Sequence, residues 1–167
     1  ILEHALLRTQ AAPLRKVLID AKLGKDVDSE FETDVMQPFF SIIINNSEKD
    51  RAEKFRSLVM ETLQDLTDKG LDRTLMEASL NLYEFKLREA DFGSAPKGLI
   101  YNIRCMKSWL YDGDPVAYLY YEDLLKKLRT GLDNSYFENL IRKYFLENPH
   151  ATLLTLAPSK TMAAEKE

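Results

Sequence analysis

Residues 28–46 read DSEFETDVMQPFFSIIINN, and this stretch decides the fold class. In its first half, Phe31, Thr33 and Val35 alternate with acidic residues, which is the period-two pattern of a strand with one face in water. Its second half is rich in β-branched and aromatic residues and predicts a more buried strand. Pro38 lies between the two runs, where a missing backbone donor does least harm. The stretch therefore predicts an antiparallel pair of strands.

On both sides of this pair, apolar residues recur at helical spacing. Helices are expected at residues 1–9, from Pro13 to Gly24, from Ser47 to Gly70, around residues 75–85, from Ser94 through Leu110, from Asp114 to Gly131, and from Tyr136 to Asn148. The helix after Ser94 is expected to bury an apolar stripe made of Leu99, Ile103, Met106 and Leu110. Residues 150–158, HATLLTLAP, predict a last strand that joins the pair.

This order of elements predicts an α+β domain: a small, antiparallel-containing sheet of about three strands, covered by six or seven helices. The chain has 167 residues, which suits one domain. Its net charge of −4 provides no basic field for nucleic acid or anionic lipid, so neither is an expected partner. The first residue is Ile1, and residues 1–9 resemble the interior of a helix. We therefore expect the chain to be a piece of a longer protein.

An acidic run at Glu84, Arg88, Glu89 and Asp91 raises the question of catalysis. Glu84 and Arg88 are four residues apart, so on a helix their side chains meet as a salt bridge. A carboxylate pair for acid–base chemistry needs a cleft and two separated pKa values, and the sequence indicates neither. The run is therefore interpreted as a solvated helix face, with an enzyme built on Glu84 and Glu89 as the less favoured reading.

The sequence offers few metal ligands or nucleophiles. His4 and His150 are the two histidines, and neither has a second ligand at the spacing of a zinc site. Cys105 is the single cysteine and is expected to be a small core or boundary residue. No catalytic or metal-binding residue is therefore assigned to this chain.

An aromatic turn at residues 109–121 carries Trp109, Tyr111, Tyr118, Tyr120 and Tyr121. Packing between helices is the expected role of these rings. A partner-binding patch is the alternative, and it would suit a free-standing helical adaptor.

Several strings together resemble a known family. They are APLRKVLIDAKLGKDV (12–27), QPFFSI (37–42), EASLNLYEFKLREADFGSAPKGL (77–99), WLYDGDPVAYLYYEDLLKKLR (109–129) and YFENLIRKYFLENPHATLLTLAPS (136–159). In this order they are similar to the presequence-protease branch of the pitrilysin/insulinase zinc metallopeptidases.

This resemblance implies a peptidase of homologous α/β domains that close around a peptide-digesting chamber. Residues 1–157 correspond to the greater part of its second, non-catalytic domain, which is of the LuxS/MPP-like type, and residues 158–167 to the start of a helical linker. The His-x-x-Glu-His zinc motif of the family is absent here, so zinc is expected in the parent enzyme and not in this piece. This piece is expected to be inactive alone.

The resemblance also implies an edge strand that binds the amino end of a captured peptide by strand addition. The matching residues are Lys25, Asp26, Val27, Asp28, Ser29, Glu30, Phe31, Glu32 and Thr33. Expected partners are the other domains of the peptidase and unfolded peptides, with a homodimer of this piece as a possibility. A cytoplasmic location is expected if the source is bacterial.

Overall fold

The computed structural model describes residues 1–159 and 161. Two strands are formed, β1 (Asp26–Glu32) and β2 (Phe39–Asn45). The helices are η1 (His4–Arg8), α1 (Pro13–Asp20), η2 (Lys49–Arg51), α2 (Ala52–Lys69), α3 (Arg73–Glu89), α4 (Lys97–Trp109), η3 (Ala117–Leu119), α5 (Glu122–Gly131), α6 (Tyr136–Ile141) and η4 (Arg142–Leu146). Within these described residues, no helix is both long and apolar enough to span a bilayer.

β1 and β2 form the predicted antiparallel hairpin. Asp26 pairs with Asn45 at one end and Glu32 pairs with Phe39 at the other. The α+β class is confirmed, and α1 to α6 match the expected number of helices. The sheet of the described residues has two strands, so the expectation of about three strands is corrected.

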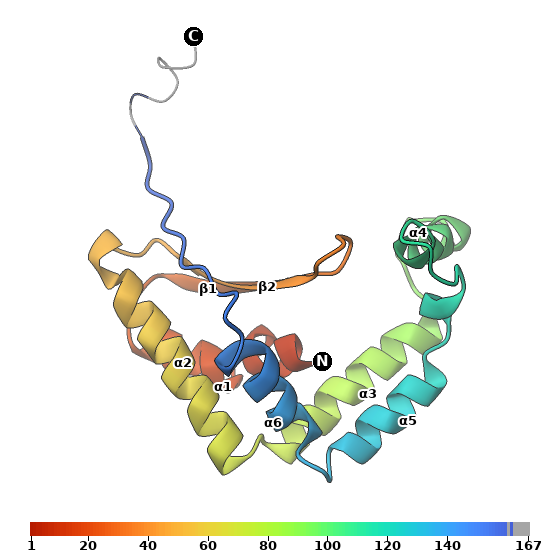
Figure 1. The fold of residues 1–167 in the computed structure, drawn as a ribbon, viewed down its shortest axis with the longest axis horizontal. Coiled ribbons are helices and arrows are strands. Elements are labelled where there is room, and N and C mark those ends of the chain that lie inside the picture. The colour runs from red at the N-terminus through yellow and green to blue at the C-terminus, as the bar shows by residue number, and fades with distance from the viewer. Residues whose placement is uncertain (160, 162–167) are drawn as a thin grey trace.

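The main core lies between the hairpin and the helices beneath it, α1, α2 and α6 (Figure 1). Its fully or almost fully buried members are Leu6, Leu7, Leu14, Leu18, Leu23, Val27, Val59, Leu63 and Ile141. Each buried side chain of this kind contributes roughly 1.5–3 kcal/mol relative to exposure. This core fixes η1 and α1 against β1.

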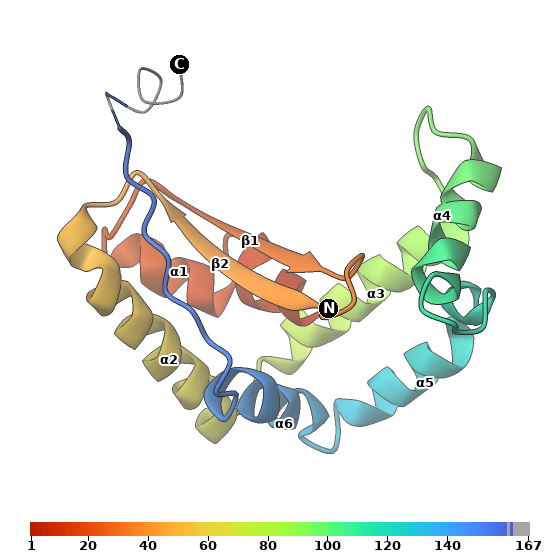
Figure 2. The same cartoon turned by 45° about the horizontal axis from the view of Figure 1, so that its top comes forward.

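An arm extends from this body (Figures 1 and 2). In this arm, α3 and α5 lie side by side, and α4 stands at the far end. Asp72 caps α3, because its carboxylate accepts a hydrogen bond from the Leu75 amide at 3.1 Å. Lys107 of α4 pairs with Asp34 in the turn between β1 and β2, which ties the end of the arm to the hairpin.

The expected burial of the α4 stripe is wrong. Leu99, Ile103, Met106 and Leu110 are 53%, 45%, 39% and 66% exposed. These four residues do lie at helical spacing in α4, but an apolar stripe on a helix is buried only where another element covers it. Among the described residues, η3 is the one element that packs closely against α4.

The expected last strand at residues 150–158 is also wrong. This segment follows η4 past β2 without pairing into the sheet (Figure 2), and Leu154 and Leu156 are 74% and 87% exposed. Its apolar composition favours a strand, but a strand forms only beside a partner.

Two helix boundaries differ from expectation. The helix expected from Asp114 is the short turn η3 followed by α5, with Tyr120 in an extended conformation after η3. The last helix ends in the π-helical turn η4. Most of the expected linker, residues 160 and 162–167, lies outside the described residues.

We predict that Gly24→Ala destabilises the hairpin. An added Cβ would lie 2.6 Å from the Asn45 carbonyl oxygen and 2.7 Å from Cγ1 of Ile44. Relieving this overlap costs about 1–3 kcal/mol. Urea unfolding measures the loss.

Gly98→Ala is the matched control, because nothing lies within 4 Å of a Cβ at that position in α4. It should gain roughly 0.5–1 kcal/mol from helix propensity. Equal effects of the two substitutions would contradict the close approach of Gly24 to β2.

Candidate functional site

The predicted peptide-binding segment, residues 25–33, coincides with β1. β2 covers one side of this strand, and in the described part of the chain no strand covers the other side. Val27 and Ser29 turn their side chains into the core, whereas Asp26, Asp28 and Glu30 are exposed. Within the described residues, β1 therefore has an open side, as β2 also does. The use of β1 as a peptide site stays a prediction.

The backbone of Val27 shows which groups face the open side. Its carbonyl accepts a hydrogen bond from Nη1 of Arg15, and its amide donates to Oδ1 of Asp26 at 2.8 Å. Because the N–H and C=O of one strand residue point the same way, both groups of Val27 point away from β2. Backbone groups alternate in direction from one strand residue to the next, so the N–H and C=O groups of Ser29 and Phe31 also point away from β2.

A second arginine holds the next open carbonyl. Nη2 of Arg8 donates to the Ser29 carbonyl at 2.6 Å. The same guanidinium binds Oε1 of Glu3 through Nε at 2.9 Å and Nη2 at 2.7 Å. The Ser29 hydroxyl also donates to this carboxylate oxygen, at 3.0 Å. Glu3 therefore orients Arg8 over the backbone of β1.

Arg15 is oriented in the same manner by Asp26. Its Nη2 lies 2.7 Å from Oδ1 of Asp26. The hydrogen bond from the Val27 amide, and after it the one from Arg15, lower the pKa of Asp26. The carboxylate is therefore charged at neutral pH and holds both groups.

A small cavity of about 190 Å³ lies along this open side. It is lined by Leu7, Arg8, Gln10, Arg15, Val27, Asp28 and Ser29. Arg8 comes from η1 and Arg15 from α1, so the packing of two helical segments against β1 builds it. Sequence reasoning missed both arginines and Glu3, because nothing in their spacing indicates a contact with a strand.

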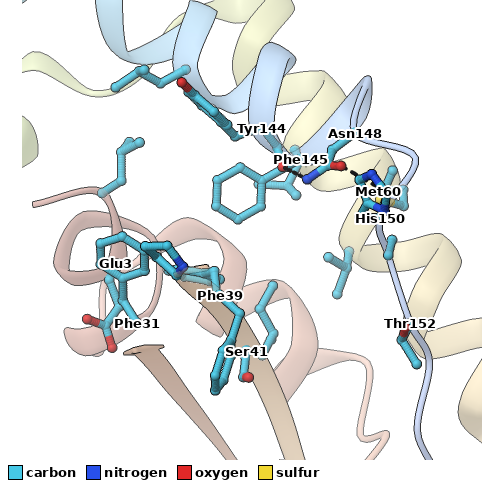
Figure 3. A pocket seen from close by; sticks show the side chains of 18 of the residues that line it. Glu3, Phe31, Phe39, Ser41, Met60, Tyr144, Phe145, Asn148, His150 and Thr152 are labelled. Atoms are coloured by element: carbon cyan, nitrogen blue, oxygen red, sulfur yellow. Dashed lines mark hydrogen bonds between the residues drawn. The ribbon is translucent and has the colours of Figure 1, made fainter. Parts of the chain in front are cut away.

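A larger hollow of about 1240 Å³ opens on the other side of the hairpin, and Figure 3 shows the side chains around it. It is bounded by β2, by α2, by α6 with η4 and by the segment after η4. It is also lined by residues 1–3, Phe31 of β1, Tyr83 of α3 and Leu128 of α5. Most of its lining is apolar, and Phe40 packs edge-on against Phe145 with ring centroids 5.0 Å apart. The hollow offers apolar surface and no evident catalytic group.

His150 lies at the rim of this hollow, where its backbone amide donates to Oδ1 of Asn148 at 2.9 Å (Figure 3). His4 lies elsewhere, as the first residue of η1, and its side chain contacts α3. Its Nδ1 is 2.9 Å from Oγ of Ser79, whose hydroxyl donates to the Leu75 carbonyl. Burial, with help from nearby positive charges, lowers the pKa of His4. The structure therefore does not bring the two histidines together.

Within residues 1–159 and 161, no three His, Cys, Asp or Glu side chains are arranged to hold a metal ion. Cys105 is half-buried in α4, in agreement with a boundary position. Trp109, Tyr111, Tyr118 and Tyr120 are 49–72% exposed, so the expected packing of the aromatic turn is wrong for these four rings. The turn lies at the end of the arm, where little else covers it.

The acidic run is explained by the pairing of α3 with α5. Glu84 accepts hydrogen bonds from Arg88 at 2.9 Å and from Arg129 of α5. Arg129, followed by Arg88, lowers the pKa of Glu84. A carboxylate held ionised between two guanidinium groups is a structural brace and a poor general acid or base at neutral pH.

We predict that Glu84→Gln lowers the free energy of unfolding at pH 7, because it removes the charge that joins α3 to α5. The pKa of Glu84 is lower in the folded than in the unfolded state, so its stabilisation is lost as the pH falls below the ordinary range of a glutamate. The difference between wild type and variant, measured by urea unfolding, should therefore shrink in acid.

Asp65→Asn is the control, since Asp65 pairs with Lys69 inside the single helix α2. Its effect should be smaller. An equal effect of the two substitutions would contradict the bracing role of Glu84.

Comparison with known proteins places the chain inside longer relatives. It is 46% identical over 166 residues to Protein HypA of Clostridium perfringens, covering 99% of this chain and 17% of that protein. It is 36% identical over 171 residues to Presequence protease 1, chloroplastic/mitochondrial, of Arabidopsis thaliana, covering 99% of this chain and 16% of that protein. It is 26% identical over 153 residues to the mitochondrial presequence protease of Xenopus laevis, covering 89% of this chain and 15% of that protein.

No family model matches the chain. The chain spans about one sixth of the length of the curated relatives it matches, at 17% and 16% for the first two. Along almost its whole length, the chain is therefore related to one segment of proteins named presequence protease.

Proposed function

We propose that this chain is a non-catalytic part of a zinc metalloendopeptidase that degrades unstructured peptides, and that it helps to enclose the chamber in which peptides are cut. In this proposal, residues 1–157 are the greater part of the second α/β domain of a pitrilysin/insulinase-type peptidase, and residues 158–167 begin a linker. The zinc is bound elsewhere in the polypeptide. In a bacterial source, the location is the cytoplasm.

One observation carries the proposal: nearly the whole chain matches a single segment of relatives that include presequence proteases. The lining of the hollow beside β2 supports it, because apolar surface of that extent is suited to contact with further protein. We propose the other domains of the same peptidase as that protein. The alternative to contact with those domains is that the hollow is covered by a second copy of this chain.

The second part of the proposal concerns β1. Its open side carries backbone groups at alternate residues, and side chains hold the Val27 amide and the Val27 and Ser29 carbonyls. An extended peptide that displaces these side chains binds such groups whatever its own side chains are. This property suits an enzyme that accepts varied unfolded peptides. The outward direction of Val27, Ser29 and Phe31 supports the proposed strand addition.

The alternative is a free-standing adaptor that binds a partner through its aromatic turn. The exposure of Trp109 and Tyr120, 62% and 72%, suits such a role. It is less favoured, because the matched relatives are longer proteins and several are named as proteases.

The proposal predicts that the 167-residue chain does not cleave an unstructured peptide, whereas the complete protein that contains it does. A chelator should abolish the cleavage, and zinc should restore it. Peptide cleavage and zinc content are measured on both proteins side by side. Zinc bound in stoichiometric amount by the chain alone, together with cleavage, would exclude a non-catalytic role.

Strand addition predicts that binding needs one free edge of the peptide backbone. A labelled, uncharged, unstructured peptide should lose binding to the complete protein when every residue is N-methylated, because neither edge can then donate hydrogen bonds to β1. N-methylation of every second residue should have much less effect, since the peptide can turn its unmethylated edge towards β1. Fluorescence anisotropy measures the binding, and unchanged binding of the fully methylated peptide would argue against strand addition.

A further inference from the structure

We propose that Arg8 and Arg15 are displaceable caps on the open side of β1, which regulate the entry of a peptide strand. This inference rests on the proposed function, because it concerns the same edge. Arg8 holds the Ser29 carbonyl and Arg15 holds the Val27 carbonyl. Both carbonyls face away from β2.

A peptide that adds to β1 must donate its amides to these same acceptors. In an antiparallel or parallel ladder, the added strand binds the N–H and C=O groups of alternate residues of the edge strand. Val27 and Ser29 are two such residues. The guanidinium groups occupy the positions that peptide amides would take, so peptide and arginine compete for the carbonyls.

Each cap is anchored by a carboxylate, and the two anchors differ in exposure. The Glu3 side chain is 15% exposed and holds Arg8, whereas the Asp26 side chain is 55% exposed and holds Arg15. An ion pair in contact with water is weaker than one that is shielded from it. The guanidinium side chains have the opposite order, since Arg8 is 50% exposed and Arg15 is 28% exposed, so each cap has one partner in contact with water.

The surroundings allow the caps to move without unfolding the strand. The two arginines and β1 line the cavity of about 190 Å³, and the Arg8 side chain is itself 50% exposed. A released guanidinium can stay paired with its carboxylate while its contact with the backbone is broken. β1 keeps its pairing with β2 throughout, because the caps bind only the side facing away from β2.

The caps also explain how an edge strand is kept from pairing with an unwanted strand. A strand edge with unpaired backbone N–H and C=O groups can pair with a strand of another chain, and natural proteins shield such edges. Side-chain caps shield the row reversibly, whereas a covering strand would close it. Reversible shielding is what an edge that must admit a peptide requires.

The test compares binding of the uncharged, unstructured peptide by the complete protein and by three variants. Arg8→Met with Arg15→Met keeps the apolar stems and removes both caps. We expect tighter binding, on the order of tenfold, because the peptide no longer has to displace two charged donors. Lys16→Met is the matched control: it removes one positive charge from the exposed side of the same helix α1 and should leave binding unchanged.

Arg15→Met alone is the third variant, in case loss of Arg8 leaves the shielded Glu3 unpaired and the double variant unfolds. Asp26 is half-exposed and can be hydrated, so this single variant should fold and bind about threefold more tightly. Circular dichroism checks the fold of each variant.

The outcomes separate this inference from the proposed function. Tighter binding by the capless variants, abolished by N-methylation of every peptide residue, supports the caps. Equal binding by wild type and both capless variants, still abolished by full methylation, overturns the caps and leaves strand addition intact. Binding that survives full methylation, or no binding by any of the proteins, overturns both.

Discussion

The backbone groups on the open side of β1 impose the constraint on which the rest of this structure depends. β2 pairs with one side of the strand and leaves the N–H and C=O groups of alternate residues on the other side without a strand partner. Polar backbone groups near a core need hydrogen-bond partners. Here Arg8, Arg15 and Asp26 supply them, and this requires η1 and α1 to lie against β1. The buried leucines of these two helical segments hold them there.

The rest of the chain presents apolar surface that its own elements leave uncovered. The hollow beside β2, the stripe of α4 and the leucines after η4 all show it. Glu84 joins α3 to α5 within the arm, and Lys107 of α4 pairs with Asp34 in the hairpin turn. Uncovered apolar surface is suited to contact with further protein, which is why the proposed function treats this chain as a scaffold and assigns the chemistry elsewhere.

The local pattern of the sequence predicted the hairpin and most helices. The spacing of apolar residues and the presence of capping residues depend only on neighbours a few positions apart, so both can be recognised in the sequence. It did not predict the exposure of Leu99 and Ile103, since helical spacing identifies a stripe and says nothing of what covers it. For the same reason, residues 150–158 have a strand's composition but no strand partner. At the candidate site, the alternation of residues 28–35 indicated an edge strand. The arginines that hold its backbone depend on tertiary packing, and no spacing in the sequence reveals that.

The most direct measurement is site-resolved amide hydrogen exchange in the complete protein, with and without a bound peptide that resists cleavage. The account predicts slower exchange on peptide binding at Ser29 and Phe31, whose amides face the open side, and little change at Glu30, which faces β2. Unchanged exchange at Ser29 and Phe31, with the peptide demonstrably bound, would contradict the account.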